Sequence, residues 1–302
     1  MFLSAGRAGA VLLASSLLLG GCESSESLGT LHREMGGTGG MTLAEEPRLV
    51  PALSDPEARD TDPSFTEDLR ELYFMSERSG NKEIWRSERP DPASEWGAPE
   101  IVPELAREGE EENPTISNDG RDIWFFTDRD RGRGSLWHAS RAARGEAWSE
   151  PEPVPELTTG DGSSDVSVAV DPARILFVLN SKLTGNQPYQ LYQIDRDGPD
   201  GDFSEPVLLE NVVSDADEFD PDLRQGGRVL VFDSRRSGRG QIHLTTRDDA
   251  GERFRESAPL EALRSDFEDG APALSEDLDY VMFSSDRSGN IDIYEARLVP
   301  PL

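Results

Sequence analysis

The sequence predicts an all-β protein, a single β-propeller with five blades of four short antiparallel strands that is closed by an N-terminal strand. Three observations predict it. An apolar phrase recurs five times at nearly constant spacing, turn residues separate short extended runs, and no stretch of useful length has helical periodicity. The 302 residues, 35% of them hydrophobic, are enough to bury the core of one large all-β domain.

Each copy of the repeat is anchored on a phenylalanine, and successive anchors are 51, 52, 55 and 51 residues apart. The anchors are Phe74, Phe125, Phe177, Phe232 and Phe283. Eleven residues earlier, in a short extended phrase, stand Pro63, Pro114, Val166, Pro221 and Pro272. A third strand follows each anchor and carries Trp85, Trp137, Tyr192, His243 or Tyr294. A fourth strand follows in the first four copies, near Trp96, Trp148, Phe203 and Phe254. Four strands in roughly fifty residues are typical of a propeller blade.

The fifth copy ends at Leu302, too soon for a fourth strand of its own. The N-terminal phrase "EEPRLVPALSD", Glu45 to Asp55, is similar to "SEPEPVPELTT" in the second copy. We therefore expect it to complete the last blade, which removes an open sheet edge. Ala44 stands where the other fourth strands have an aromatic residue. The predicted propeller covers residues 46–302.

The first residues predict a secretory signal peptide over residues 1–21. Arg7 precedes an apolar stretch, Ala8 to Leu19, that is too short for a comfortable membrane span. The stretch ends in "LGGC", which resembles the lipobox of bacterial lipoproteins and implies that Cys22, the single cysteine, carries lipid. Residues 22–45 are rich in Ser, Gly and Glu, and they predict a flexible tether.

These features indicate a protein of the bacterial cell envelope that is held at a membrane by its N-terminal lipid. Glu23 is not the Asp that resembles an inner-membrane retention signal, so we expect the outer membrane, with the propeller facing the periplasm or the cell surface. Lys and Arg number 30 against 60 Asp and Glu, a net charge of −30. Such a surface repels nucleic acid and favours cationic partners, and the simpler interpretation is that the acidity only keeps a secreted protein soluble.

Two phrases, "NPTISNDGRDIWFFTDRDRG" and "APALSEDLDYVMFSSDRSG", match the repeat phrase of TolB-like, WD40-like β-propellers. The chain resembles this family over about Pro47 to Leu302. The resemblance implies that the loops from fourth to first strand and from second to third strand share one face around a central channel. TolB itself has six blades and an additional N-terminal domain, so the resemblance does not carry its partners to this chain.

Acidic residues recur in the first of these loop sets and arginines in the second. Directly before the proline position stand Asp62, Asn113, Asp165 and Asp220, and two residues earlier Asp60, Glu111, Glu218 and Asp269. The second loop set carries Arg78, Arg129, Arg236 and Arg287. These residues are the candidate binding face. They form either an acidic ring that attracts a cation, a basic peptide or a sugar, or ion pairs that staple neighbouring loops.

The sequence predicts no catalytic residues, metal site or cofactor. It has no Gly-x-Ser-x-Gly motif and no histidines at metal-ligand spacing, and the Asp-rich stretch Asp195–Asp202 misses EF-hand spacing. The predicted function is a non-catalytic interaction module that binds a protein or peptide through its acidic loop face. The alternative is a propeller that binds or cleaves a glycan in its channel with axial carboxylates such as Asp62, Asp165 and Asp220. The loops contain few aromatics, mainly Phe219 and Phe267, and this favours the first hypothesis.

Overall fold

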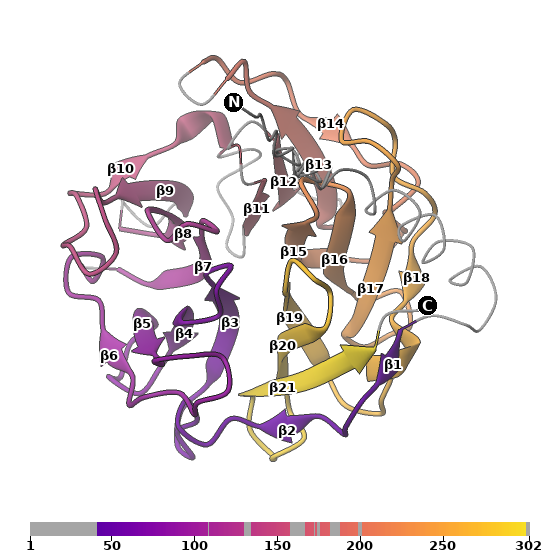
Figure 1. Ribbon diagram of the computed structural model, residues 1–302. Coiled ribbons are helices and arrows are strands. Elements are labelled where there is room, and N and C mark those ends of the chain that lie inside the picture. Colours follow the sequence, from indigo (N-terminus) through magenta and orange to yellow (C-terminus); the bar gives the residue numbers. More distant parts are fainter. Residues whose placement is uncertain are drawn as a thin grey trace, which may run out of the picture.

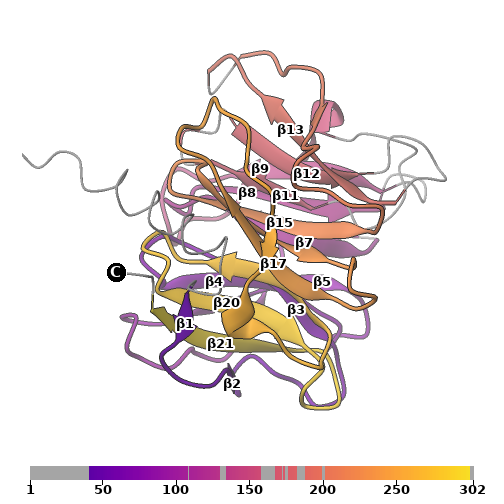
Figure 2. The ribbon, with the colours of Figure 1, turned by 90° about the vertical axis from the view of Figure 1, so that its right-hand side faces the viewer.

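The computed structural model describes residues 41–107, 109–129, 134–157, 167–171, 173, 176–181, 188–198 and 201–299. Five antiparallel sheets stand in a ring around a central channel, and this arrangement confirms the predicted five-bladed propeller (Figure 1). Turned by 90°, the sheets of successive blades lie face to face (Figure 2). No described residues form a helix that is long and apolar enough to cross a membrane.

Blades 1 to 4 each consist of four consecutive strands, the first lining the channel and the fourth lying at the rim. Blade 1 contains β3 (Asp60–Phe65), β4 (Glu71–Ser76), β5 (Glu83–Glu88) and β6 (Glu100–Ile101). Blade 2 contains β7 (Glu111–Ile116), β8 (Asp122–Thr127), β9 (Ser135–Ser140) and β10 (Glu152–Pro153). Blade 3 contains β11 (Val168–Val170), β12 (Leu176–Ser181), β13 (Gln190–Asp195) and β14 (Val207–Leu208). Blade 4 contains β15 (Glu218–Arg224), β16 (Val229–Ser234), β17 (Gln241–Thr246) and β18 (Ala258–Pro259).

The fourth strands are shorter than the sequence phrases suggest. Each is a two-residue pairing, and in blades 2 and 4 a short 3₁₀ turn follows it, η1 (Pro155–Leu157) and η2 (Glu261–Leu263). Prolines in these phrases explain the difference, because a residue without a backbone N–H cannot extend a hydrogen-bonded ladder.

The N-terminal segment closes the ring, as predicted. Blade 5 contains β19 (Asp269–Leu274), β20 (Tyr280–Ser285) and β21 (Asp292–Val299), and β2 (Arg48–Leu49) pairs with β21 as its outer strand. A further pairing, between β1 (Thr42–Leu43) and the end of β21, extends this closure N-terminal to residue 46. The two ends of the propeller domain are therefore joined by two short ladders.

The apolar residues do not form one central core in the described part of the chain. They form five clusters, each between two neighbouring blades. The anchors Phe74, Phe125, Phe232 and Phe283 are completely buried in them. Each such side chain contributes about 1.5–3 kcal/mol to stability, so the regular spacing of the anchors reflects one equivalent packing position per blade.

A stack of an arginine on an aromatic ring fastens the outer strand of each of the first four blades. Its members are Arg89 on Trp96, Arg141 on Trp148, Arg196 on Phe203 and Arg247 on Phe254, at 4.1, 4.4, 4.7 and 4.1 Å from the ring centroid. Such contacts combine cation–π attraction with close packing. In blade 5 the arginine position is occupied by Leu298, which is buried in the cluster between blades 4 and 5. The outer strand of blade 5 therefore lacks both partners of this stack: Ala44 stands at the position of the aromatic residue, and Leu298 stands at the position of the arginine.

Whether the pairing of β2 with β21 stabilises the closed ring can be tested by mutation. Leu49 lies opposite Tyr294 and packs on the cluster between blades 4 and 5. We expect Leu49→Asp to lower the free energy of unfolding by about 2–3 kcal/mol, because it places a charge against apolar neighbours. Denaturant unfolding measures this, with Glu46→Ala as the exposed control on the same segment. An equal effect of both variants would show that β2 does not hold the ring closed.

Candidate functional site: the acidic channel mouth

The predicted arginines pair with the predicted carboxylates in the four blades where both are described. The pairs are Arg78–Asp60, Arg129–Glu111, Arg236–Glu218 and Arg287–Asp269, at 2.6, 3.0, 2.9 and 2.9 Å. All four carboxylates are buried. Of the two interpretations of the loop residues, the stapling one is confirmed for these eight residues.

Arg129 shows how each staple works. Its Nη2 donates to Glu111 Oε1 at 3.0 Å and to the Leu105 carbonyl at 2.8 Å, and its Nε donates to Thr127 at 3.2 Å. The guanidinium also lies 4.9 Å from the ring centroid of Trp137. Burial raises the pKa of Glu111 to about 7, and Arg129 opposes this shift. One arginine thus joins the preceding blade's last loop to the first three strands of its own blade.

The second set of predicted residues shares an unusual backbone conformation. Asp62, Asn113, Asp220 and Ala271 have φ of +57°, +53°, +48° and +44°. Each lies in a β-bulge, because the register of the first strand shifts there in blades 1, 2, 4 and 5. Asp and Asn adopt this left-handed conformation more readily than most residues. Local backbone preference therefore accounts for part of the recurrence of Asp and Asn at this position.

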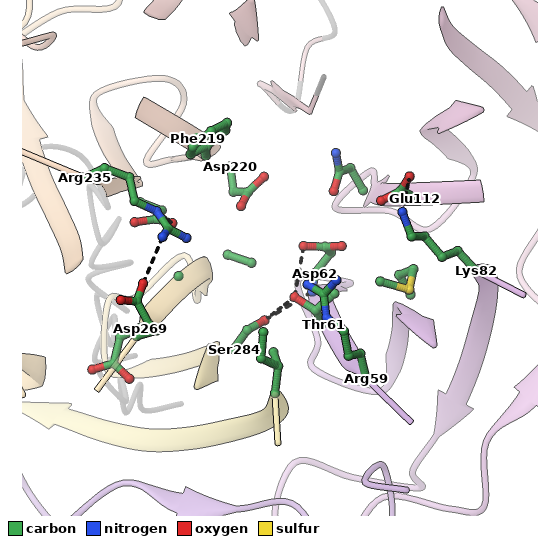
Figure 3. Close-up of a pocket in the computed structure, with 17 residues that line it drawn as sticks. Arg59, Thr61, Asp62, Lys82, Glu112, Phe219, Asp220, Arg235, Asp269 and Ser284 are labelled. Atoms are coloured by element: carbon green, nitrogen blue, oxygen red, sulfur yellow. Dashed lines mark hydrogen bonds and ion pairs between the residues drawn. The ribbon is translucent and has the colours of Figure 1, made fainter. Parts of the chain in front are cut away.

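These bulges face the channel, where a cavity of about 290 Å³ opens at the mouth (Figure 3). Its lining includes six carboxylates and three cations. The carboxylates are Asp62, Glu112, Asp220, Asp233, Glu268 and Asp269, and the cations are Arg59, Lys82 and Arg235. The predicted residues Asp62, Asn113, Asp220 and Asp269 thus come together at one cavity. Asp165 and Cys22 lie outside the described residues.

Asp62 lines the cavity and interacts with carboxylates of other blades. Burial raises its pKa well above the ordinary value, and the charges of Asp220 and Glu112 raise it further, whereas Arg59 and Thr61 lower it. Thr61 Oγ1 donates to Asp62 at 3.2 Å and contacts Ser284 across the interface with blade 5 at 2.7 Å. The carboxylates of blades 1, 2 and 4 are therefore close enough to sense one another's charge.

Asp233 is a member of the site that the sequence analysis missed. It directly follows the anchor Phe232, at the position of Met75, Phe126 and Ser284 in other blades. It is 3% exposed, and burial raises its pKa well above the ordinary value despite Arg235. Arg59 was missed in the same way, because it replaces the acidic residue that precedes the first strand in other copies. Both could have been found as departures from the repeat.

The opposite end of the channel is crossed by hydrogen bonds between blades that are not neighbours. Asn118 of blade 2 donates to Glu276 of blade 5 at 2.9 Å and accepts from Arg224 of blade 4 at 3.3 Å. Arg224 also pairs with Asp222 at 3.0 Å, and Glu276 accepts from the Gln225 backbone at 2.8 Å. We call this set the cross-channel network. Access to the cavity is therefore from the acidic mouth, where the first strands begin.

Metal binding finds no support in the part of the chain that the structure describes. No three His, Cys, Asp or Glu side chains there are grouped so that they could hold a metal ion. Two of the three cations that line the cavity, Lys82 and Arg235, are instead paired with carboxylates of its lining. Lys82 lies 3.0 Å from Glu110 and 3.1 Å from Glu112, and Arg235 lies 2.9 Å from Glu268.

No family model matches the chain, and no curated protein matches its sequence. Solved structures similar to it include TolB from Acinetobacter baumannii, at 14% identity and a TM-score of 0.52, over 81% of this chain and 56% of that chain. A family 117 glycoside hydrolase from Zobellia galactanivorans aligns at 12% identity and a TM-score of 0.58, over 85% and 90% of the two chains. The α-L-arabinofuranosidase PaAbf62A from Podospora anserina aligns at 11% and 0.55, over 80% and 91%.

At these identities the likeness is one of fold. The chain has a β-propeller fold that is similar to those of TolB and of glycoside hydrolases. The fold by itself therefore does not specify the chemistry, which depends on the residues at the channel mouth.

Proposed function

We propose that the protein is a non-catalytic, lipid-anchored propeller of the bacterial cell envelope that binds a protein or peptide partner at its channel mouth. The observation that carries this proposal is the cavity itself, with six carboxylates against three cations and one aromatic side chain, Phe219, in its lining. Such a mouth projects a negative field toward cationic partners. Sugar sites, by contrast, usually offer aromatic faces for stacking.

Crosslinking in intact cells tests the proposal, with the full-length lipidated protein and mass spectrometry of what it captures. We expect a reproducible protein partner, and we expect the double variant Asp62→Asn/Asp220→Asn to lose most of that capture. The charge-matched control is Glu152→Gln/Glu205→Gln, two exposed carboxylates at the rim. Absence of a captured protein, or equal capture by both double variants, would contradict binding at the mouth.

The anchor has a separate test. We expect Cys22→Ser to move the protein from the membrane fraction to the soluble envelope fraction, because removal of the acyl chains removes about 0.8 kcal/mol per buried CH₂. Fractionation followed by immunoblotting measures the distribution, and Ser24→Ala is a matched control in the same segment. A Cys22→Ser protein that stayed in the membrane fraction would overturn the lipobox interpretation.

A second candidate function is binding or cleavage of a glycan in the channel. It is favoured by the fold shared with glycoside hydrolases and by Asp62, a carboxyl group with a raised pKa beside another carboxylate. A protonated carboxyl next to an ionised one is the arrangement that glycosidases use. Release of reducing sugar from envelope glycans by the wild type, abolished in Asp62→Asn, would favour this candidate over the first.

A further inference from the structure

The cavity at the mouth holds more negative charge than its own cations neutralise. Lys82 and Arg235 are engaged by Glu112 and Glu268, and Arg59 lies 3.8 Å from Glu77 outside the cavity. Asp269 is held by Arg287 of the staple at 2.9 Å. The formal charge of the lining is therefore negative, and a bound cation of suitable size would favour the ionised forms of Asp62 and Asp233, whose pKa values burial raises.

A second observation points to a ligand that donates hydrogen bonds. Oδ1 of Asp233 is buried and has no hydrogen-bond partner among the described residues, while Oδ2 lies 3.6 Å from Arg235 Nε. A buried acceptor without a partner is unfavourable by itself. The position does not require a carboxylate for folding, since other blades carry Met75 or Ser284 there.

The shape of the mouth adds an apolar surface. Phe219 directly precedes Asp220 and lines the cavity, and its ring packs against Tyr189 with centroids 4.9 Å apart. Figure 3 shows Phe219 beside Asp220, with Asp62 on the other side of the opening. Lysine and arginine side chains combine an apolar stem with a cationic end, so they match an opening that has an apolar ring beside carboxylates.

We propose that the cavity binds a single lysine or arginine side chain of the partner protein, with its cationic end toward Asp62, Asp220 and Asp233 and its stem beside Phe219. The proposal rests on the proposed function and specifies the group recognised. The cross-channel network crosses the far end of the channel, so the side chain enters from the mouth. The acidic loops around the mouth extend the negative field well beyond the cavity, which suits a protein surface rather than a free amine.

Isothermal titration of the full-length protein with capped pentapeptides Gly-Gly-X-Gly-Gly tests the proposal, with X as Lys, Arg or Gln. We expect the Lys or Arg peptide to bind at least tenfold more tightly than the Gln peptide. We expect Asp233→Asn and Asp62→Asn each to reduce this affinity about tenfold or more, and Glu152→Gln to leave it unchanged. Asp62→Asn retains the fold, because Asn113 shows that Asn fits the same left-handed position.

Three results would overturn the inference. Equal affinity for the Gln peptide would exclude recognition of the cation. An unchanged affinity in both Asp variants would exclude this cavity. Binding of n-butylammonium as tight as that of the Lys peptide would assign the site to a free amine. If one of these results were found but a partner were still captured in cells through the mouth, the proposed function would stand without this inference. If the peptides bound as expected but no partner were captured in cells, the proposed function would be contradicted and the inference about the cavity would stand.

Discussion

Replacement of His243 by phenylalanine is expected to stabilise the protein and to remove part of its sensitivity to acid. His243 is 2% exposed, and neither ring nitrogen has a hydrogen-bond partner among the described residues. It lies opposite the anchor Phe232, where other blades pair a larger aromatic with the anchor. Removing two buried polar atoms without partners should add about 1–2 kcal/mol at neutral pH.

The acid effect follows from the pKa of the same residue. Burial, together with the charge of Arg236, lowers the pKa of His243 to about 3. In the unfolded chain His243 has an ordinary pKa of 6.5, so it binds a proton at mildly acidic pH, whereas in the folded state it stays neutral. Above pH 6.5 His243 is neutral in both states and its protonation does not affect stability. As the pH falls from 6.5 toward 3, protonation of the unfolded chain lowers the free energy of unfolding. At ~1.4 kcal/mol per pH unit, the total loss is about 5 kcal/mol.

Denaturant unfolding of wild type and His243→Phe from pH 7 to pH 4 measures both effects. The difference between the two proteins should widen as pH falls, which separates His243 from the carboxylates that titrate in both. His138→Phe is the control, because His138 is half-buried and its Nε2 lies 2.9 Å from Asp122 Oδ1. A constant difference across this pH range would show that His243 is not buried in its neutral form.

Replacement of Arg129 by methionine is expected to destabilise the protein strongly. Methionine keeps the stem but leaves Glu111 buried without its cation and the Leu105 carbonyl without its donor. Breaking a buried ion pair from one side costs about 3–5 kcal/mol, which corresponds to roughly 10 °C in Tm for a domain of this size.

The matched control is Arg121→Met in the same blade. Arg121 pairs with Asp119 at 2.8 Å, but the two side chains are 53% and 37% exposed. An exposed pair contributes about 0–1 kcal/mol, so this variant should unfold close to the wild type. Thermal unfolding of the two variants compares them directly. Similar Tm values would mean that the staple contributes no more than a surface ion pair.

The features that the sequence predicted are those that most blades repeat. The anchors, the arginine staples and the acidic residues before proline each recur in register, so the structural role of a residue in one copy predicts the role of its equivalents in the other copies. Blade number and closure by β2 followed from the same count. What recurs is also what builds the blade, and the stapled residues are accordingly structural.

The features that were missed occur once. Asp233 and Arg59 depart from the repeat, and only their place on the ring shows that both line one cavity. The cross-channel network joins Asn118, Arg224 and Glu276, which are far apart in the sequence, and Asn118 belongs to blade 2, which is not a neighbour of blade 4 or blade 5. Such contacts depend on the diameter of the closed ring, which no local pattern encodes.

Among the described residues, the outer strand of blade 5 lacks the arginine–aromatic stack that fastens the outer strands of blades 1 to 4, and this has a mechanical consequence. The segment that leads toward the N-terminus leaves the propeller at β1, and the last blade is held there by two ladders of two residue pairs each. Tension on the N-terminal segment is therefore applied directly to the least fastened outer edge of the ring, one short ladder after the other. Under load the propeller should open at this blade first, while the four blades with stacked arginines retain their amide protons against exchange with solvent.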